Sequence, residues 1–435
     1  MLLKFRIYLL IPLWLTIAMV IGIKIFLTPA IPWIATACLV LLFPGVAMAR
    51  ASWRQMRPES RRSAVMFGAS LALFAACILL TDSAVGQWDV GLKYGVKYAL
   101  LLGAFGVLLA AQVRGEVMIR ALVVLLVVNL VALVLCIALY VGMQLLPDGR
   151  IGSLVNPPGV LWKIGGYTFI YFAYRLLAGG GIRAFVLTVL CLLTVGLDGS
   201  RSAFLIALVG YGLMFGWYVI GHRQLPSVRQ GLLVLLTVPL GFWLMPVGVK
   251  ASLNFFYHAT QVEAQGNVAE HRILALAKVM PMHRHMGAHT PRLAAQGLAP
   301  SQNDVTRKEM FLRAIHRIQQ HPLWGGGTGS TAVATAAGAM YVHMTYLQIW
   351  GDYGLPALLC YLAALGAFVY AARAYVAAWR AGKVQRPEEG LLCVFILLGY
   401  GLYGLFNPLS NEPSEWALYL LALAVLITET DGAYA

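Results

Sequence analysis

Charged residues are scarce in this sequence of 435 residues, since Asp, Glu, Lys and Arg together make up only 11% of it. A soluble globular domain carries about 25%, so the composition excludes an ordinary soluble protein. Hydrophobic residues make up 60% of the chain, and apolar runs of about 20 residues, enough to cross a bilayer as a helix, recur from end to end. These runs do not alternate apolar and polar residues, as a spanning β-barrel requires. The sequence therefore predicts an all-α polytopic membrane protein.

The sequence also lacks internal repeats and any cysteine spacing that is typical of a disulfide framework or a metal site. The six cysteines show neither a CxxC spacing nor a neighbouring histidine, and each lies inside an apolar run. We therefore expect small side chains that face the core or lipid, and neither disulfide bonds nor a metal framework. The first apolar run follows MLLKFR and resembles a signal peptide, but no clean small-residue cleavage site follows it. We interpret this run as an uncleaved first helix.

The apolar runs predict about 12 spanning helices by the length rule. They lie near residues 7–27, 31–49, 63–81, 92–112, 119–146, 163–178, 184–197, 203–220, 230–249, 353–377, 390–407 and 414–430. Cytoplasmic loops carry an excess of Lys and Arg, and the basic loops of this chain follow one parity. They contain Arg50, Arg54, Arg57, Arg61 and Arg62, then Arg114 and Arg120, Arg175 and Arg183, Arg223 and Arg229, and Arg380, Lys383 and Arg386. Both termini are then predicted to be cytoplasmic.

The connection from 250 to 340 is the exception to this pattern. It falls on the outer side, yet basic residues outnumber acidic ones in it, and it holds most of the histidines. Long loops translocate largely regardless of charge, so the topology stands. The sequence thus divides into nine spans over 1–249, an outer loop domain over 250–340 that favours anions, and three spans over 341–435.

Within this loop, the segment KEMFLRAIHRIQQH has the period of an amphipathic helix. Its apolar positions are Met310, Phe311, Ala314, Ile315 and Ile318, and its opposite face is basic. One interpretation is a helix packed on the membrane domain. Another is an interfacial helix whose arginine face meets lipid phosphate. The two interpretations are compatible.

Two short outer segments carry charge or turn chemistry. RIGSLVNPPG, from Arg150 to Gly159, has the Asn-Pro-Pro sequence of a turn, and Lys163 follows it. GLDGSRSAFL places Asp198 and Arg201 in a very short turn between two spans. A charge at membrane level indicates function by default. The alternative is a lone snorkelling arginine paired with Asp198.

Two further segments lie around the end of the large loop. In HPLWGGGTGS, the glycines allow a tight turn whose backbone N–H groups could hold an anion, although it is not a P-loop because no GK[ST] follows. In YVHMTYLQIWGDYGL, His343 and Asp352 are nine residues apart, or about 13 Å along one helix. They cannot share a hydrogen bond unless the helix breaks, and Gly351 and Gly354 make a break plausible.

In their order, these features resemble the O-antigen ligase/polymerase superfamily. The matching residues are Asn156-Pro157, Ser200-Arg201, Arg307 ahead of Pro322 to Ser330, and His343 with Leu347, Asp352 and Gly354. The resemblance covers residues 150–360 in motifs and the whole chain in span count. It implies a GT-C-like glycosyltransferase architecture in the bacterial inner membrane, with the active site facing the periplasm. The family's histidine-asparagine pair is His343-Met344 here.

The resemblance implies transfer of a glycan from undecaprenyl diphosphate to an acceptor hydroxyl. A neutral imidazole suits the general base, and arginine suits diphosphate. The implied roles are a catalytic base for His343, diphosphate binding for Arg201, Arg307, Arg150 and Lys163, and support for Asp352, Asp198 and Asn156. Three other arginines of the loop compete with Arg307 for its role, namely Arg272, Arg284 and Arg313. We expect a direct displacement with inversion, since no carboxylate nucleophile neighbours the site.

We expect lipid A-core as the acceptor, because its phosphates would be attracted by the basic loop. The partners are then undecaprenyl-diphosphate-linked O-antigen, lipid A-core oligosaccharide and membrane lipid, and no nucleic acid. We expect no cofactor and no metal, since the acidic residues of the loop are sparse and show no DxD spacing; arginines could act in place of a cation. The alternatives are an O-antigen polymerase, a protein O-oligosaccharyltransferase and, more distantly, a secondary transporter.

Overall fold

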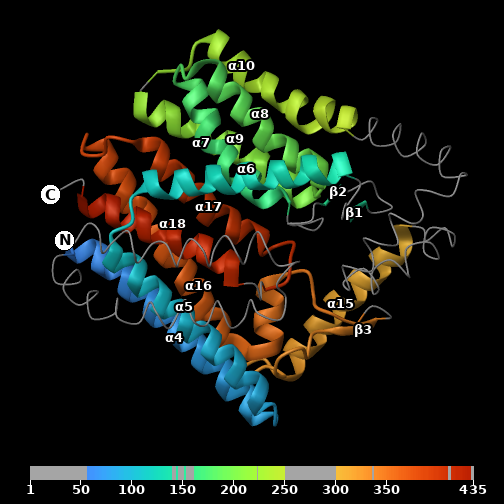
Figure 1. Cartoon of the computed structure of the whole chain (residues 1–435). Helices are drawn as coiled ribbons and strands as arrows, with labels where there is room; N and C mark the ends of the chain where they lie inside the picture. The colour runs from blue at the N-terminus through green and yellow to red at the C-terminus, as the bar shows by residue number, and fades with distance from the viewer. Residues whose placement is uncertain are drawn as a thin grey trace, which may run out of the picture. The chain divides into compact units, whose positions relative to one another are not determined.

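The computed structural model describes residues 56–139, 144–145, 151–152, 161–222, 224–249, 300–335, 338–409 and 413–432. These residues form helices apart from turns and two short antiparallel hairpins (Figure 1). The helices are α4 (Pro58–Ala84), α5 (Trp88–Ala111), α6 (Gly115–Leu139), α7 (Trp162–Leu177), α8 (Gly181–Asp198), α9 (Arg201–His222), α10 (Val228–Pro239) with the π-helical η1 (Leu240–Leu244), α15 (Pro300–Gln320), α16 (Thr345–Arg380), α17 (Pro387–Tyr403) and α18 (Pro413–Gly432). The strands are β1 (Gln144–Leu145), β2 (Ile151–Gly152), β3 (Val333–Thr335) and β4 (Gly338–Met340).

The prediction of apolar helices is confirmed throughout the described chain. Each predicted span from 63–81 onward overlaps a helix, but the span of 119–146 extends too far, because residues 144–145 form a strand. The predicted spans 7–27 and 31–49 lie outside the described residues. Seven of the described helical segments are long and apolar enough to cross a membrane: α4, α5, α6, α8, α9, Val228–Val249 and α16. The protein is therefore a multi-pass helical membrane protein, and the total of about 12 spans stays a prediction.

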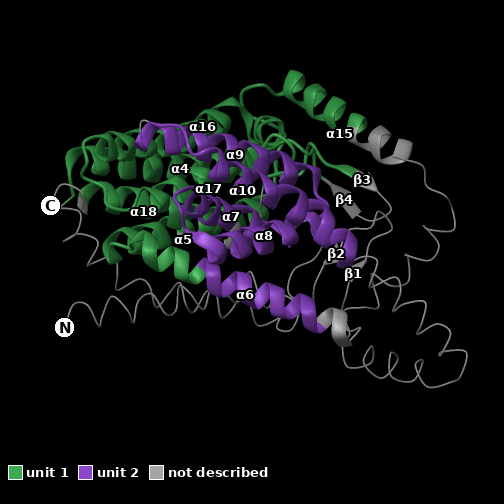
Figure 2. Cartoon of the chain, turned by 90° about the horizontal axis from the view of Figure 1, so that it is seen from above, with its two compact units in different colours: residues 1–20, 29–121, 301–435 green, residues 21–28, 122–300 purple. Residues whose placement is uncertain are grey.

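The chain packs as two compact units, which Figure 2 shows in different colours. Unit 1 contains α4, α5, the start of α6 as far as Ala121, and α15 to α18, whereas unit 2 contains the rest of α6 and α7 to α10. Each unit is described separately below. Residues 250–299, which make up most of the predicted loop domain, lie outside the described residues. The predicted division at residues 249 and 340 therefore stays a prediction.

Unit 1 is held together by aromatic side chains between α4 and α16. Phe67 stacks on Phe368 with ring centroids 5.4 Å apart, and Phe74 lies 5.8 Å from Tyr361. Both phenylalanines are completely buried. Such aromatic pairs add stabilisation beyond the area that they bury, so α4 provides the surface on which the long helix α16 is positioned.

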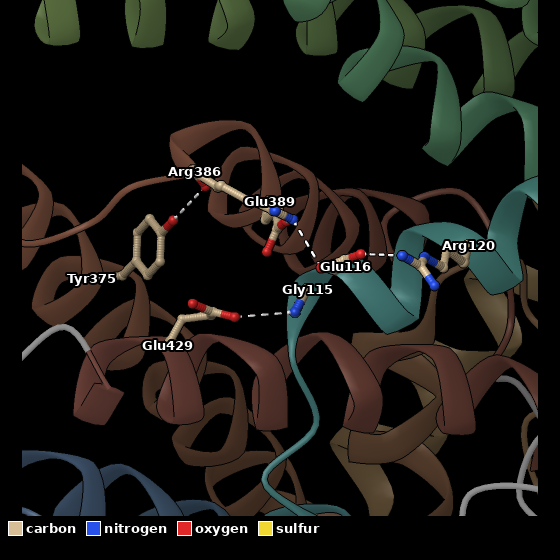
Figure 3. Close-up of polar contacts among 7 residues, drawn as sticks. All are labelled: Gly115, Glu116, Arg120, Tyr375, Arg386, Glu389 and Glu429. Carbon is tan, nitrogen blue, oxygen red and sulfur yellow. Dashed lines mark hydrogen bonds and ion pairs between the residues drawn. The ribbon is translucent and has the colours of Figure 1, made fainter. Parts of the chain in front are cut away.

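An ionic cluster joins α6 to α17 at one end of unit 1 (Figure 3). The Nη1 atom of Arg386 donates to Glu116 Oε2 at 3.1 Å and to Glu389 Oε1 at 3.2 Å. Arg120 pairs with the same Glu116 from one turn further along α6. Glu389 is buried, whereas both arginines are exposed. Two of the predicted cytoplasmic basic loops therefore meet at this cluster.

The start of α4 and the last turn of α18 lie at the same end of unit 1. The Gly115 N–H donates to Glu429 Oε1 at 3.2 Å (Figure 3), and the Arg57 N–H donates to Asp431 Oδ1 at 3.3 Å. This end of unit 1 therefore brings together three of the basic loops: those before α4 and α6, and the one between α16 and α17. The prediction that these loops lie on one side of the membrane requires such an arrangement. Which side of the membrane this end faces stays a prediction.

Candidate functional site

The helix α16 is interrupted near its start, as the glycine pattern predicts. Gly354 has φ 85° and ψ 177°, a conformation that is essentially limited to glycine, and Pro356 follows it. A Cβ atom at position 354 would collide with the carbonyl oxygen of Leu323. Pro322 O also accepts the N–H of Leu355 at 3.2 Å and the indole N–H of Trp350 at 2.9 Å. The break therefore admits the segment that leads into the glycine-rich turn.

The glycine-rich turn, residues 325–331, uses its backbone N–H groups inside the protein. Gly326 and Gly327 donate to the carbonyl oxygens of Gly351 and Asp352 at 2.9 and 2.8 Å. Gly325 and Ser330 donate to carbonyl oxygens of residues 321 and 327. The other three N–H groups bind carboxylates of the chain itself. The prediction that this turn holds a ligand anion is therefore wrong, because internal acceptors occupy its donors.

Asp352 is one of these internal anions. Its Oδ1 accepts the Thr331 N–H at 2.9 Å and the Ser330 hydroxyl at 3.0 Å, while its Oδ2 accepts the Gly329 N–H at 3.3 Å. The carboxyl group is completely buried. A buried carboxylate needs such donors to offset the loss of hydration. Asp352 therefore positions the turn.

Asp82, in the last turn of α4, is the second internal anion and was not predicted from the sequence. Its two oxygens accept the N–H and the hydroxyl of Thr328, each at 2.7 Å, and the same hydroxyl lies 2.9 Å from the hydroxyl of Tyr353. Asp82 is completely buried. The available sequence signal was an aspartate directly after an apolar run, in ILLTDSAVG. Its partner could not be identified, because Thr328 lies 246 residues away.

His343 lies two residues before α16 and is half-buried. Its neighbour Val342 is buried against Met310 and Ala314 of α15, and Met344 packs on the same cluster. The predicted amphipathic helix therefore packs beside the histidine segment.

The start of α16 is fixed by Thr345, whose N–H donates to Gly404 O at 2.8 Å and whose hydroxyl donates to Asn407 O at 2.9 Å. The predicted span of 353–377 lies within α16 and begins beside the break at Gly354, while the helical turns before the break begin at Thr345. The break at Gly354 comes after Asp352, so it does not bring that carboxylate back to His343. The donors that bind Asp352 come instead from the glycine-rich turn.

Arg307 belongs to α15, three residues before Met310. Met310 and Ala314 of the same helix pack beside Val342. The competing residue Arg313 is exposed on the same helix. The other two competitors, Arg272 and Arg284, lie outside the described residues.

In unit 2, three of the predicted residues lie at the same end. Asp198 ends α8, is completely buried, and its Oδ2 accepts the Trp162 N–H at the start of α7 at 3.3 Å. Lys163 follows Trp162, and Arg201 begins α9 with its side chain exposed. Among the described residues Arg201 forms no ion pair, so the alternative of pairing with Asp198 is not observed.

The remaining site predictions are not tested by this structure. Arg150 and Asn156 lie outside the described residues. Within the described ranges, no three His, Cys, Asp or Glu side chains are placed to share a metal ion, and the metal-free reaction stays a prediction. Arg201 belongs to unit 2 and His343 to unit 1. Their convergence on one pocket also stays a prediction.

Seven described helical segments of spanning length and apolar composition define the chain as a multi-pass membrane protein. The family model described as O-antigen ligase matches residues 186–362, and this match supports assignment of the chain to the O-antigen ligase family. Members of that family are glycosyltransferase-like enzymes, either ligases or polymerases. No curated protein matches the chain. The matched segment contains Arg201, Arg307, His343 and Asp352.

Proposed function

We propose that the protein is an O-antigen ligase. It transfers a glycan from undecaprenyl diphosphate to a sugar hydroxyl of lipid A-core at the periplasmic face of the bacterial inner membrane. The observation that carries this proposal is the family match over residues 186–362. This segment encloses Arg201, which begins the span-length helix α9, and His343, which lies two residues before the span-length helix α16. That is where a donor held by its lipid tail and a water-exposed acceptor can meet.

His343 acts as the general base. The acceptor hydroxyl attacks the anomeric carbon, the bond between that carbon and the phosphate oxygen breaks, and undecaprenyl diphosphate leaves. The hydroxyl proton passes to the imidazole, and the configuration inverts. A positioned general base contributes about 10²- to 10⁴-fold in rate. The half-buried side chain of His343, on a segment fixed by α15 and Thr345, suits such a role.

Arg201 stabilises the diphosphate leaving group. Its exposed guanidinium lies at the N-terminus of α9, where the helix dipole also favours an anion. Arginine offers fixed, fork-shaped donors for phosphate oxygens. Lys163, Arg307 and Arg150 add positive charge, so that cationic side chains provide the electrostatic stabilisation and no metal is needed.

Three further residues have supporting roles. Asp198 accepts the N–H of Trp162 and thereby fixes the start of α7, the helix that contains Lys163. Asp352 fixes the glycine-rich turn that follows α15. Asn156 precedes α7 in the sequence. The proposal includes about 12 spans in a GT-C-like architecture with both termini cytoplasmic.

Reconstitution with a lipid-diphosphate-linked glycan and purified lipid A-core, in the presence of a chelator, tests this proposal. We expect glycan to appear on lipid A-core at a rate that the chelator does not change. Loss of transfer in the chelator would contradict the metal-free mechanism. Growth of polymer on the lipid carrier without any lipid A-core would contradict the ligase activity and favour the polymerase of the same superfamily.

A further inference from the structure

The helix α15 presents three different sides. Met310, Ala314 and Ile318 are buried, as an amphipathic helix packed on its own protein requires. Phe311 and Leu312, however, remain 47% and 54% exposed. On the remaining side are polar or charged residues at the spacing of successive helical turns, namely Glu309, Arg313, His316 and Gln320. An apolar strip therefore remains uncovered beside a polar one.

This strip lies where two spans end. The buried side of α15 contacts Val342, Met344 and Leu347, on both sides of the point where the span-length helix α16 begins at Thr345. The segment after α15 is tied to α4, because the Thr81 hydroxyl donates to Trp324 O at 3.1 Å. Thr81 is three residues from the end of α4, another helix of spanning length. If α4 and α16 cross the bilayer, these two contacts place α15 close to one end of each span.

Exposed apolar side chains continue beyond α15. Leu323 and Trp324 are 55% and 68% exposed. On α4 and just after it, Leu73, Leu80 and Val85 are also exposed, on a helix whose outer side faces lipid if it spans the bilayer. Tryptophan is enriched at the interface between the membrane and water, where its ring sits at headgroup level. The outer surface of α4 and the segment after α15 therefore both expose apolar side chains.

Positive charge flanks the strip. Lys308 lies four residues before Leu312 and so on the same side of the helix. Lys308 and Arg313 are exposed, and neither forms an ion pair within the described part of the chain. A helix with an exposed apolar strip and flanking cations is the type that lies in the headgroup region of a bilayer.

We propose that α15 and Leu323-Trp324 form a bilayer-docking surface. Phe311, Leu312, Leu323 and Trp324 insert at the boundary between headgroups and acyl chains, and Lys308 contacts the phosphate of membrane phospholipid. The occupant is the lipid bilayer, and the proposal is independent of the reaction that the enzyme catalyses. Its consequence is that the helix beside His343 is held at a fixed depth in the membrane.

Site-specific photocrosslinking in the full-length protein tests this surface. Benzoylphenylalanine replaces Leu312 or Trp324 in one set of proteins and Glu309 or His316, on the polar side of α15, in the matched set. Each protein is reconstituted in vesicles of phosphatidylcholine with phosphatidylglycerol and irradiated. We expect lipid adducts several-fold more abundant at positions 312 and 324 than at 309 and 316. Equal yields at the two sets, or adducts to protein in place of lipid at 312, would overturn the proposal.

The cationic contribution is tested in the same system. Lys308→Gln should reduce the lipid adduct at position 312 in vesicles that contain phosphatidylglycerol, and reduce it less in pure phosphatidylcholine. Lys383→Gln, which lies in the loop between α16 and α17, is the control and should change neither yield. If Lys308→Gln leaves the adduct unchanged in both kinds of vesicle, the lysine does not contact lipid phosphate.

Discussion

At the scale of single residues, Asp82 and Asp352 explain how the glycine-rich turn is held. Each carboxylate is completely buried, and each accepts donors from the turn. Asp82 comes from α4 and Asp352 from α16, so the turn connects two helices that are also packed through aromatic side chains. The glycines are needed because backbone must approach backbone closely, not because a ligand phosphate must be held.

The contribution of Asp82 is testable with Asp82→Asn. The asparagine amide would face a donor of Thr328, so at least one hydrogen bond to a charged group is lost, at a cost of about 1.5–3 kcal/mol. We expect a lower midpoint of thermal unfolding in lipid nanodiscs. Asp89→Asn, at an exposed position in the first turn of α5, is the control and should leave the midpoint unchanged. Thr328→Ser keeps both donors and should behave like the control, and an unchanged Asp82→Asn protein would refute this role.

At the scale of helices, the sequence predicted where the spans lie but not how their ends are fixed. Apolar runs identify helices because every backbone polar group must be satisfied within lipid. The bonds that fix the start of α16 were not predicted, since Thr345 donates to the carbonyl oxygens of Gly404 and Asn407, which follow α17 in the chain. The break at Gly354 was anticipated from local sequence, whereas the Asp82 to Thr328 contact was not. Contacts between segments that are distant in the sequence leave no pattern in the local sequence from which they could be predicted.

The break in α16 predicts different costs for two glycines with positive φ. Gly354→Ala places a Cβ against the Leu323 carbonyl, whereas Gly382→Ala, just after α16, meets open space. We expect Gly382→Ala to cost about 1–2 kcal/mol from its backbone conformation alone. Gly354→Ala should cost clearly more and should displace the glycine-rich turn. Equal unfolding midpoints for the two variants would show that the close approach at 354 is not important for stability.

The ionic cluster predicts unequal roles for its two arginines. Arg386→Gln leaves the buried Glu389 without its cationic partner, and an unsatisfied buried group costs about 1–3 kcal/mol. Arg120→Gln removes a pair between two exposed groups, and such surface pairs contribute little. We therefore expect a clear decrease in the unfolding midpoint for the first variant and almost none for the second. The reverse order would mean that Glu389 is satisfied in another way.

At the scale of the whole molecule, the proposed reaction depends on two residues that are far apart in the sequence. Arg201 begins α9 in unit 2, and His343 precedes α16 in unit 1. The sequence indicated both residues because ionisable groups at membrane level are costly and therefore indicate a functional site by default. A role for both in one transition state predicts strong coupling between them, since residues that act as a unit are not additive in their kinetic effects.

The most direct test measures kcat and KM for the lipid-linked donor in wild type, His343→Ala, Arg201→Ala and the double variant, reconstituted with lipid A-core. The account predicts that His343→Ala lowers kcat by about 10²- to 10⁴-fold, and that the double variant is little worse than the more impaired single variant. Normal turnover by His343→Ala, or fully additive losses in the double variant, would contradict a shared site for the imidazole and the guanidinium.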